Sequence, residues 1–267
     1  RQYIDIGLKY NIPIMITTPT RKVNSESMKN SKFHGKNIIH DSFDFLSGIK
    51  ESYGIYSSNI LLGGLLGCKG DAFSSINPMG IYESYKFHRN QTSQFSVHNT
   101  DFLLAGIMPE INEAHGMAMA MAETGIPYII SFMLRKDGCL IDGTPIYKAI
   151  EIIDNNVSPM PVCYIANCIH PTNLRLALSN EKNKNKPQLT RFKGIQSNAS
   201  TLSPEELNNC LTLHQGDFKI MIEEMQLLFR EFELKIFGGC CGTNDKFIDE
   251  LAVAMPWTKK STGGSDD

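Results

Sequence analysis

The chain has 267 residues, of which 42% are hydrophobic and 20% charged, and its formal net charge is −2. This length allows one large α/β domain or two small ones, and the balanced charge argues against a surface that binds nucleic acid. No apolar run approaches the roughly 20 residues that span a bilayer, and no basic-then-apolar leader opens the chain. We therefore expect a cytoplasmic protein that binds neither nucleic acid nor membrane.

Short apolar runs alternate along the chain with amphipathic stretches, which is typical of βα units around a parallel sheet. The chain opens in a helical stretch, and seven strand candidates follow. In chain order the expected strands are Ile12–Thr18, Asn59–Leu66, Asp101–Ile107, Pro127–Leu134, Pro161–Asn167, Phe192–Ser197 and Leu234–Phe237. The expected helices are Arg1–Tyr10, Asp41–Tyr53, Ile81–His98, Glu110–Thr124, Pro145–Asn155, Pro171–Asn180, Pro204–Leu213, Gly216–Phe232 and Thr243–Met255.

An eight-stranded barrel needs one strand more than these seven candidates. The simplest interpretation is a (β/α)8 TIM barrel that lacks its first strand here because that strand lies upstream of Arg1. An open doubly wound sheet, which tolerates seven strands, is the alternative. In the first interpretation residues 1–256 form one barrel domain, and we expect the polar tail, residues 257–267, to be disordered.

The chain contains seven cysteines, an odd number that favours a reduced compartment over a framework of disulfides. A lone cysteine in an apolar run is usually a small buried side chain. We expect this ordinary role for Cys68, Cys139, Cys163 and Cys210.

The segment most informative about chemistry is Gly238-Gly239-Cys240-Cys241-Gly242, which lies between a short strand and a helix. Adjacent cysteines form only a strained disulfide with each other, whereas flanking glycines let the backbone turn so that both thiols converge on one point. Two converging thiolates suit zinc, which still needs at least one more ligand. A phosphate-binding glycine turn is the second interpretation of this segment.

Cys168 is the best third ligand, because it also follows an apolar strand and the C-terminal ends of barrel strands share one face. Three soft ligands with one open position are typical of a catalytic zinc site. A fourth protein ligand would close the site, and His170 is the nearest candidate for that role.

These residues resemble a known family. Phe237–Thr243 and the Asn167-Cys168 pair resemble the closing and upstream motifs of the homocysteine S-methyltransferase family, and weaker similarities extend from residue 1 to about 256. The resemblance implies a (β/α)8 barrel and Zn²⁺ held by three cysteines, with the sulfur of homocysteine as the fourth ligand. The implied metal ligands are Cys168, Cys240 and Cys241, and the implied substrate contacts are Thr17, Thr18, Asn198 and Gly239.

The function that the resemblance implies is transfer of a methyl group from a small-molecule donor to the thiolate of homocysteine or a related thiol, yielding methionine. No catalytic group is needed beyond the zinc-activated thiol, because a metal-bound thiol is deprotonated near neutral pH. The identity of the donor and a homo-oligomeric state stay open.

The chain also departs from the family pattern. Gly106 stands where the family places an acidic residue that holds the amino group of the substrate, and the family's Asp-Gly-Gly loop is expected upstream of Arg1. Arg21 offers a cation to an anionic group or is simply solvated. A non-catalytic or altered-substrate zinc-binding barrel is therefore the alternative function.

Overall fold

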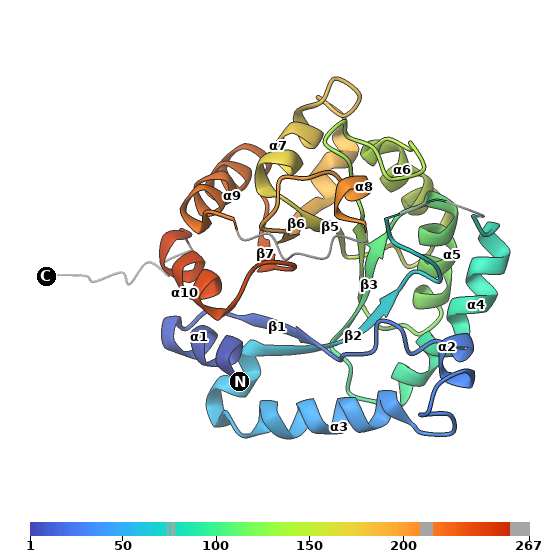
Figure 1. Cartoon of the computed structure of the whole chain (residues 1–267). Helices are drawn as coiled ribbons and strands as arrows, with labels where there is room; N and C mark the ends of the chain where they lie inside the picture. Colours follow the sequence, from blue (N-terminus) through green and yellow to red (C-terminus); the bar gives the residue numbers. More distant parts are fainter. Residues whose placement is uncertain (74, 76–77, 209–215, 257–267) are drawn as a thin grey trace, which may run out of the picture.

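The computed structural model describes residues 1–73, 75, 78–208 and 216–256. Within these residues seven parallel strands form one sheet, and each strand pairs with the next one along the chain. The strands are β1 (Ile14–Thr17), β2 (Ile60–Gly67), β3 (Phe102–Met108), β4 (Tyr128–Phe132), β5 (Cys163–Ile169), β6 (Phe192–Ser197) and β7 (Ile236–Gly239). The sheet curls into most of a barrel with the helices on its outside (Figure 1). Because the strand order never reverses, the doubly wound alternative is wrong and the barrel prediction is confirmed.

The helices fill the connections between the strands. The α-helices are α1 (Gln2–Tyr10), α2 (Ser25–Lys29), α3 (Ile38–Glu51), α4 (Ile81–Ser93), α5 (Ile111–Ala122), α6 (Ile146–Asn156), α7 (Pro171–Ser179), α8 (Pro204–Leu207), α9 (Phe218–Phe232) and α10 (Asp245–Ala254). The described residues also form the 3₁₀ helices η1 (Gly54–Asn59), η2 (Gln94–Val97) and η3 (Pro187–Arg191). No helix in the described ranges is long and apolar enough to cross a membrane.

Most of the predicted helices differ from the structure by a few residues at their ends, α2 was not predicted, and Ile81–His98 divides into α4 and η2. Helix α3 begins at Ile38 rather than at Asp41, because the side chain of Asn37 caps it by accepting a hydrogen bond from His40 N at 3.3 Å. Helix α8 ends at Leu207, where the predicted helix continued to Leu213. The backbone turns extended at Asn208, and residues 209–215 and the tail expected at 257–267 lie outside the described residues.

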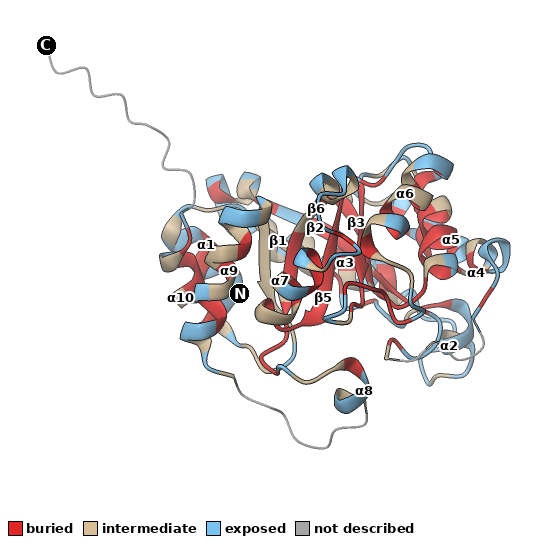
Figure 2. Cartoon of the chain, turned by 90° about the horizontal axis from the view of Figure 1, so that it is seen from above, coloured by how far each residue is buried: buried red, intermediate tan, exposed pale blue. Residues whose placement is uncertain are grey.

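The strands are largely buried (Figure 2), and the two largest apolar clusters form layers on the two faces of the sheet. The layer between the strands and the outer helices is the larger one. The smaller layer fills the inside of the curled sheet with side chains from the three strands β3, β4 and β5: Phe102, Leu104, Ile129, Cys163 and Ile165. Burying one such large apolar side chain stabilises the fold by about 1.5–3 kcal/mol, so this inner layer fixes the curvature that brings the strand ends together.

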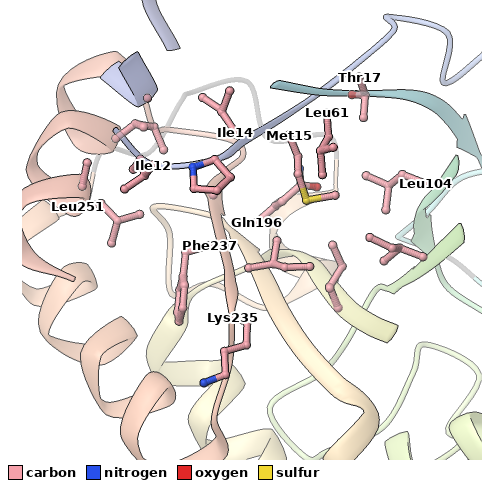
Figure 3. Close-up of a pocket in the computed structure, with 18 of the residues that line it drawn as sticks. Ile12, Ile14, Met15, Thr17, Leu61, Leu104, Gln196, Lys235, Phe237 and Leu251 are labelled. Atoms are coloured by element: carbon pink, nitrogen blue, oxygen red, sulfur yellow. The ribbon is translucent and has the colours of Figure 1, made fainter. Parts of the chain in front are cut away.

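Strands β1 and β7 form the two edges of the sheet. A cavity of about 300 Å³ lies between them and reaches from the inside of the barrel outward to α1 and α10 (Figure 3). Met15 and Leu104 line its inner part, and Ile12 and Leu251 line its outer part. The lining is mainly apolar, so this side of the barrel offers little polar chemistry. Polar side chains and thiols lie instead at the C-terminal ends of the strands.

Candidate metal centre

Three cysteine thiols converge at the C-terminal ends of β5 and β7. Their Sγ atoms all lie within 4.8 Å of one another. Cys241 Sγ is 3.6 Å from Cys168 Sγ and 3.9 Å from Cys240 Sγ. Zinc–sulfur bonds of about 2.3 Å in a tetrahedron separate the sulfurs by about 3.8 Å. The three thiols therefore fit a tetrahedral thiolate-bound metal with one further position.

The turn that carries Cys240 and Cys241 is fixed to the neighbouring strand β6. Cys240 N donates to Ser197 O at 2.7 Å, and Cys241 O accepts from Ala199 N at 2.9 Å. A Cβ at Gly239 would lie 2.1 Å from Thr243 Oγ1, so this close approach requires glycine. Backbone contacts thus hold the two thiols in place.

Cys168 is buried at the end of β5 and adopts a left-handed backbone conformation, with φ of 57°. The pairing of β5 with β6 shifts register between Asn167 and Ile169, so the bulge turns the Cys168 side chain toward the other two thiols. Asn198 Nδ2 donates to Cys168 Sγ at 3.3 Å, while Asn198 Oδ1 accepts from Ser200 N at 2.8 Å. Asn198 therefore orients one of the three thiols.

The thiols influence one another electrostatically. Hydrogen bonds from Cys168 and Cys240 lower the pKa of Cys241 well below that of a free thiol, and the Arg21 guanidinium acts in the same direction. Hydrogen bonding to Cys168 and Cys241, together with burial, raises the pKa of Cys240. The group therefore holds one thiolate readily and gives up further protons only to a cation that replaces them.

The other predicted site residues take different positions. Gly239 directly precedes the thiol pair, and Thr17 lines the cavity in Figure 3. Thr18 is buried, and its hydroxyl is engaged by Thr20 Oγ1 at 2.7 Å and Leu65 N at 3.3 Å. Contact of these residues with substrate stays a prediction.

His170 does not join the thiols. Its Nδ1 accepts a hydrogen bond from Thr172 N at 3.2 Å and so caps helix α7. Burial lowers the pKa of His170, which keeps the ring neutral and able to accept.

Three of the four cysteines predicted to be ordinary core residues are confirmed as buried: Cys68, Cys139 and Cys163. The fourth, Cys210, lies outside the described residues.

Sequence reasoning singled out Asn167 only as part of the Asn167-Cys168 pair and did not predict that polar side chains line the inside of the barrel there. Ser131 and Asn167 are buried there, and Asn167 Nδ2 donates to Gln196 Oε1. The period-two pattern of the strands could have identified them, because Ser131 and Asn167 follow the inward-facing Ile129 and Ile165 by two residues.

A second group of metal-binding side chains lies on the surface. One donor atom from each of His40, Asp44 and His98 falls within 4.8 Å of the others. His40 and Asp44 are one helical turn apart on α3, and their side chains are exposed. The His98 ring stacks on Phe43 with centroids 4.7 Å apart.

Comparison with known proteins agrees with the fold. A model of the homocysteine S-methyltransferase family matches residues 1–255. The metallated form of the homocysteine methyltransferase MmuM from Escherichia coli is 17% identical with a TM-score of 0.73, and its oxidized form is 17% identical with a TM-score of 0.74. Each alignment covers 95% of this chain and 82% of the other. No curated protein matches the sequence.

Proposed function

This chain belongs to the homocysteine S-methyltransferase family, and we propose that it is a zinc-dependent enzyme that methylates the thiolate of homocysteine or a related thiol, yielding methionine from homocysteine. The family membership makes it a methyltransferase. The metal, the acceptor and a small-molecule methyl donor are the finer parts of the proposal.

One observation carries the proposal: three thiols from two strand ends converge within 4.8 Å at the face where barrel enzymes build their active sites. The separations of their sulfurs suit a tetrahedral ion, and among the residues that the structure describes this group contains no fourth protein ligand. When bound there by Cys168, Cys240 and Cys241, zinc would supply a Lewis acid that lowers the pKa of a coordinating substrate thiol from about 8.5.

The residues of the chain have separate tasks in this scheme. Cys240 and Cys241 are held by backbone hydrogen bonds to β6, and Asn198 fixes the orientation of Cys168 through its sulfur. The positive charge of Arg21 lowers the pKa of Cys241, and it would also favour an anionic acceptor at the three thiols. The acceptor's thiolate sulfur forms its bond to the methyl carbon while the bond from that carbon to the donor's leaving atom breaks. No protein base is required, because the acceptor is already deprotonated.

The test is a titration of homocysteine into zinc-loaded protein, with heat and proton release recorded together. We expect saturable binding with release of about one proton, because a thiol that becomes a metal ligand loses its proton. Cys240→Ser should lose stoichiometric zinc and homocysteine binding together.

Zinc at one equivalent per chain with no thiol binding would contradict the proposed acceptor. The altered-substrate or non-catalytic alternative, which the neutral Gly106 favours, would then lead. Full methylation activity after zinc removal would contradict the metal assignment.

A further inference from the structure

Cys139 is buried, as predicted, but its thiol contacts a lysine. Cys139 Sγ lies 3.1 Å from Lys182 Nζ, which also donates a hydrogen bond to Asp137 Oδ2 at 2.9 Å. The Lys182 side chain is 46% exposed, whereas Cys139 is 2% exposed. The sulfur therefore lies close beneath the surface, in contact with an amine that reaches the solvent.

The two side chains come from loops that are fixed to each other. Cys139 lies between β4 and α6, and Lys182 lies between α7 and η3. Asn183, which is fully buried beside Lys182, donates from Nδ2 to Gly138 O at 2.8 Å. Cys139 N donates to Asp137 Oδ1 at 3.1 Å. The neighbours of both residues therefore hold the thiol and the amine together, so the contact does not depend on the lysine side chain alone.

The close approach of the two loops depends on a glycine. Gly138 has a φ of 83°, which side chains rarely allow, and a Cβ there would lie 2.3 Å from Asn183 Nδ2. The sequence Asp137-Gly138-Cys139 thus turns the chain sharply and places the thiol directly after the turn.

The charges around the pair decide how fast the thiol can react. Burial raises the pKa of Cys139, and the Lys182 ammonium opposes that rise. The hydrogen bond to Asp137 raises the pKa of Lys182. At rest the pair is therefore a neutral thiol beside an ammonium, and its reaction with an oxidant is slow because the thiolate is the reactive form.

We propose that hydrogen peroxide links Cys139 to Lys182 through a sulfenamide, a covalent bond between Sγ and Nζ. In the first step Sγ attacks a peroxide oxygen, the O–O bond breaks, and the products are a sulfenic acid and water. A sulfenic acid can condense with a nearby nitrogen. The fixed contact with Lys182 supplies that nitrogen.

The second step is the condensation. Lys182 passes a proton to Asp137, and the free amine attacks Sγ. The S–O bond breaks, and the departing hydroxide takes a proton from the nitrogen and leaves as water. One peroxide is consumed and two waters are formed, while the thiol and the amine each lose one hydrogen atom.

The link joins two loops beside the metal centre. The loop that carries Cys139 also carries Met133 and Ile141, which form one apolar cluster with Cys168. A bond between residues 43 positions apart restricts the unfolded chain, as a disulfide does, so it stabilises the fold. The modification is independent of the proposed methyl transfer.

The test exposes purified protein, supplied with zinc, to hydrogen peroxide. Proteolysis and mass spectrometry without reductant should reveal the peptides of Cys139 and Lys182 as a joined pair, two hydrogen atoms lighter than the separate peptides. Dithiothreitol should release both peptides unchanged, because a thiol cleaves the S–N bond. The treated protein should also unfold at a higher urea concentration than the untreated protein.

Lys182→Arg keeps the positive charge but replaces the amine with a guanidinium that does not lose its proton. This variant should form no link, and the sulfenic acid of Cys139 should instead be trapped by dimedone. Lys184→Arg is the matched control, because Lys184 pairs with Glu181 in the same loop, and it should form the link as wild type does.

The proposal is overturned if peroxide leaves the two peptides separate in wild type, whether Cys139 stays reduced or becomes a sulfinic acid. A link that forms equally in Lys182→Arg would assign the partner to a different residue. A joined pair that retains an oxygen atom would overturn the sulfenamide. None of these outcomes bears on zinc or homocysteine binding, so the methyltransferase proposal stands or falls separately.

Discussion

Among the described residues, two groups of side chains each bring three metal-binding atoms within 4.8 Å of one another, yet the surroundings of the two groups differ. The cysteines lie at strand ends, and main-chain hydrogen bonds to β6 fix the turn that carries two of them. The group of His40, Asp44 and His98 lies at the surface, where the side chains of His40 and Asp44 are 50% and 60% exposed.

The contacts of the surface group already account for its geometry. His40 and Asp44 form an ion pair one helical turn apart at 3.2 Å, and stacking on Phe43 orients His98. Such exposed pairs contribute little to stability and leave long side chains free to move. Proximity of donor atoms is therefore a weak criterion for a metal site, and the way the backbone holds those atoms is a stronger one.

The largest expected effect tests this difference directly. Cys168→Ser should lower zinc affinity by at least about a hundredfold, because zinc strongly prefers a thiolate to a hydroxyl ligand. His98→Ala should leave the stoichiometry at one zinc per chain and the affinity unchanged. Competition with a chromophoric chelator measures both. A loss of zinc in His98→Ala with retention in Cys168→Ser would reverse the comparison.

The next effect concerns the backbone of the cysteine turn. Gly239→Ala should weaken zinc binding about tenfold and destabilise the protein by about 1–3 kcal/mol, since the new Cβ would overlap Thr243 Oγ1. Gly238→Ala is the matched control, because a Cβ there meets nothing closer than Gln196 Cγ at 3.5 Å. Chemical denaturation and chelator competition should separate the two variants. Equal behaviour of both would show that the turn adapts freely.

A smaller effect is expected from the side chain that supports a thiol. Asn198→Ala removes the side-chain N–H that donates a hydrogen bond to Cys168 Sγ. We expect about a tenfold loss of zinc affinity, which is typical of groups that orient metal ligands. Asn173→Ala, which removes an exposed hydrogen bond to Thr201 O, should have no effect on zinc. An unchanged affinity in Asn198→Ala would mean that the strand ends alone position the thiol.

Much of this arrangement could be predicted from the sequence, because buried parallel strands are short continuous apolar runs and glycines beside two cysteines have few ordinary explanations. The grouping of Cys168 with residues more than seventy positions later followed from the shared face of barrel strand ends. The start of α3 at Ile38 was harder to predict, since its capping residue, Asn37, lies outside the amphipathic pattern. The polar layer at Ser131 and Asn167 is harder to find, because both residues lie inside apolar runs and only the period-two alternation of the strands indicates that they face the barrel interior.

The smallest expected effect is on the pH dependence of stability and concerns His170, the histidine that caps helix α7. Burial lowers the pKa of His170, so the unfolded chain takes up a proton at a higher pH than the folded chain does. Stability should therefore fall as the pH drops below about 6.5, the ordinary histidine value, and hold steady above it. Protonated Nδ1 can no longer accept a hydrogen bond from Thr172 N, so protonation should remove about 1 kcal/mol of stabilisation by the cap.

Urea denaturation at pH 7.5 and 5.5 measures the free energy of unfolding. The loss of stability between these pH values should be smaller in His170→Asn than in wild type, because asparagine can cap the helix but does not titrate. An undiminished loss in His170→Asn would assign the acid sensitivity to a different group.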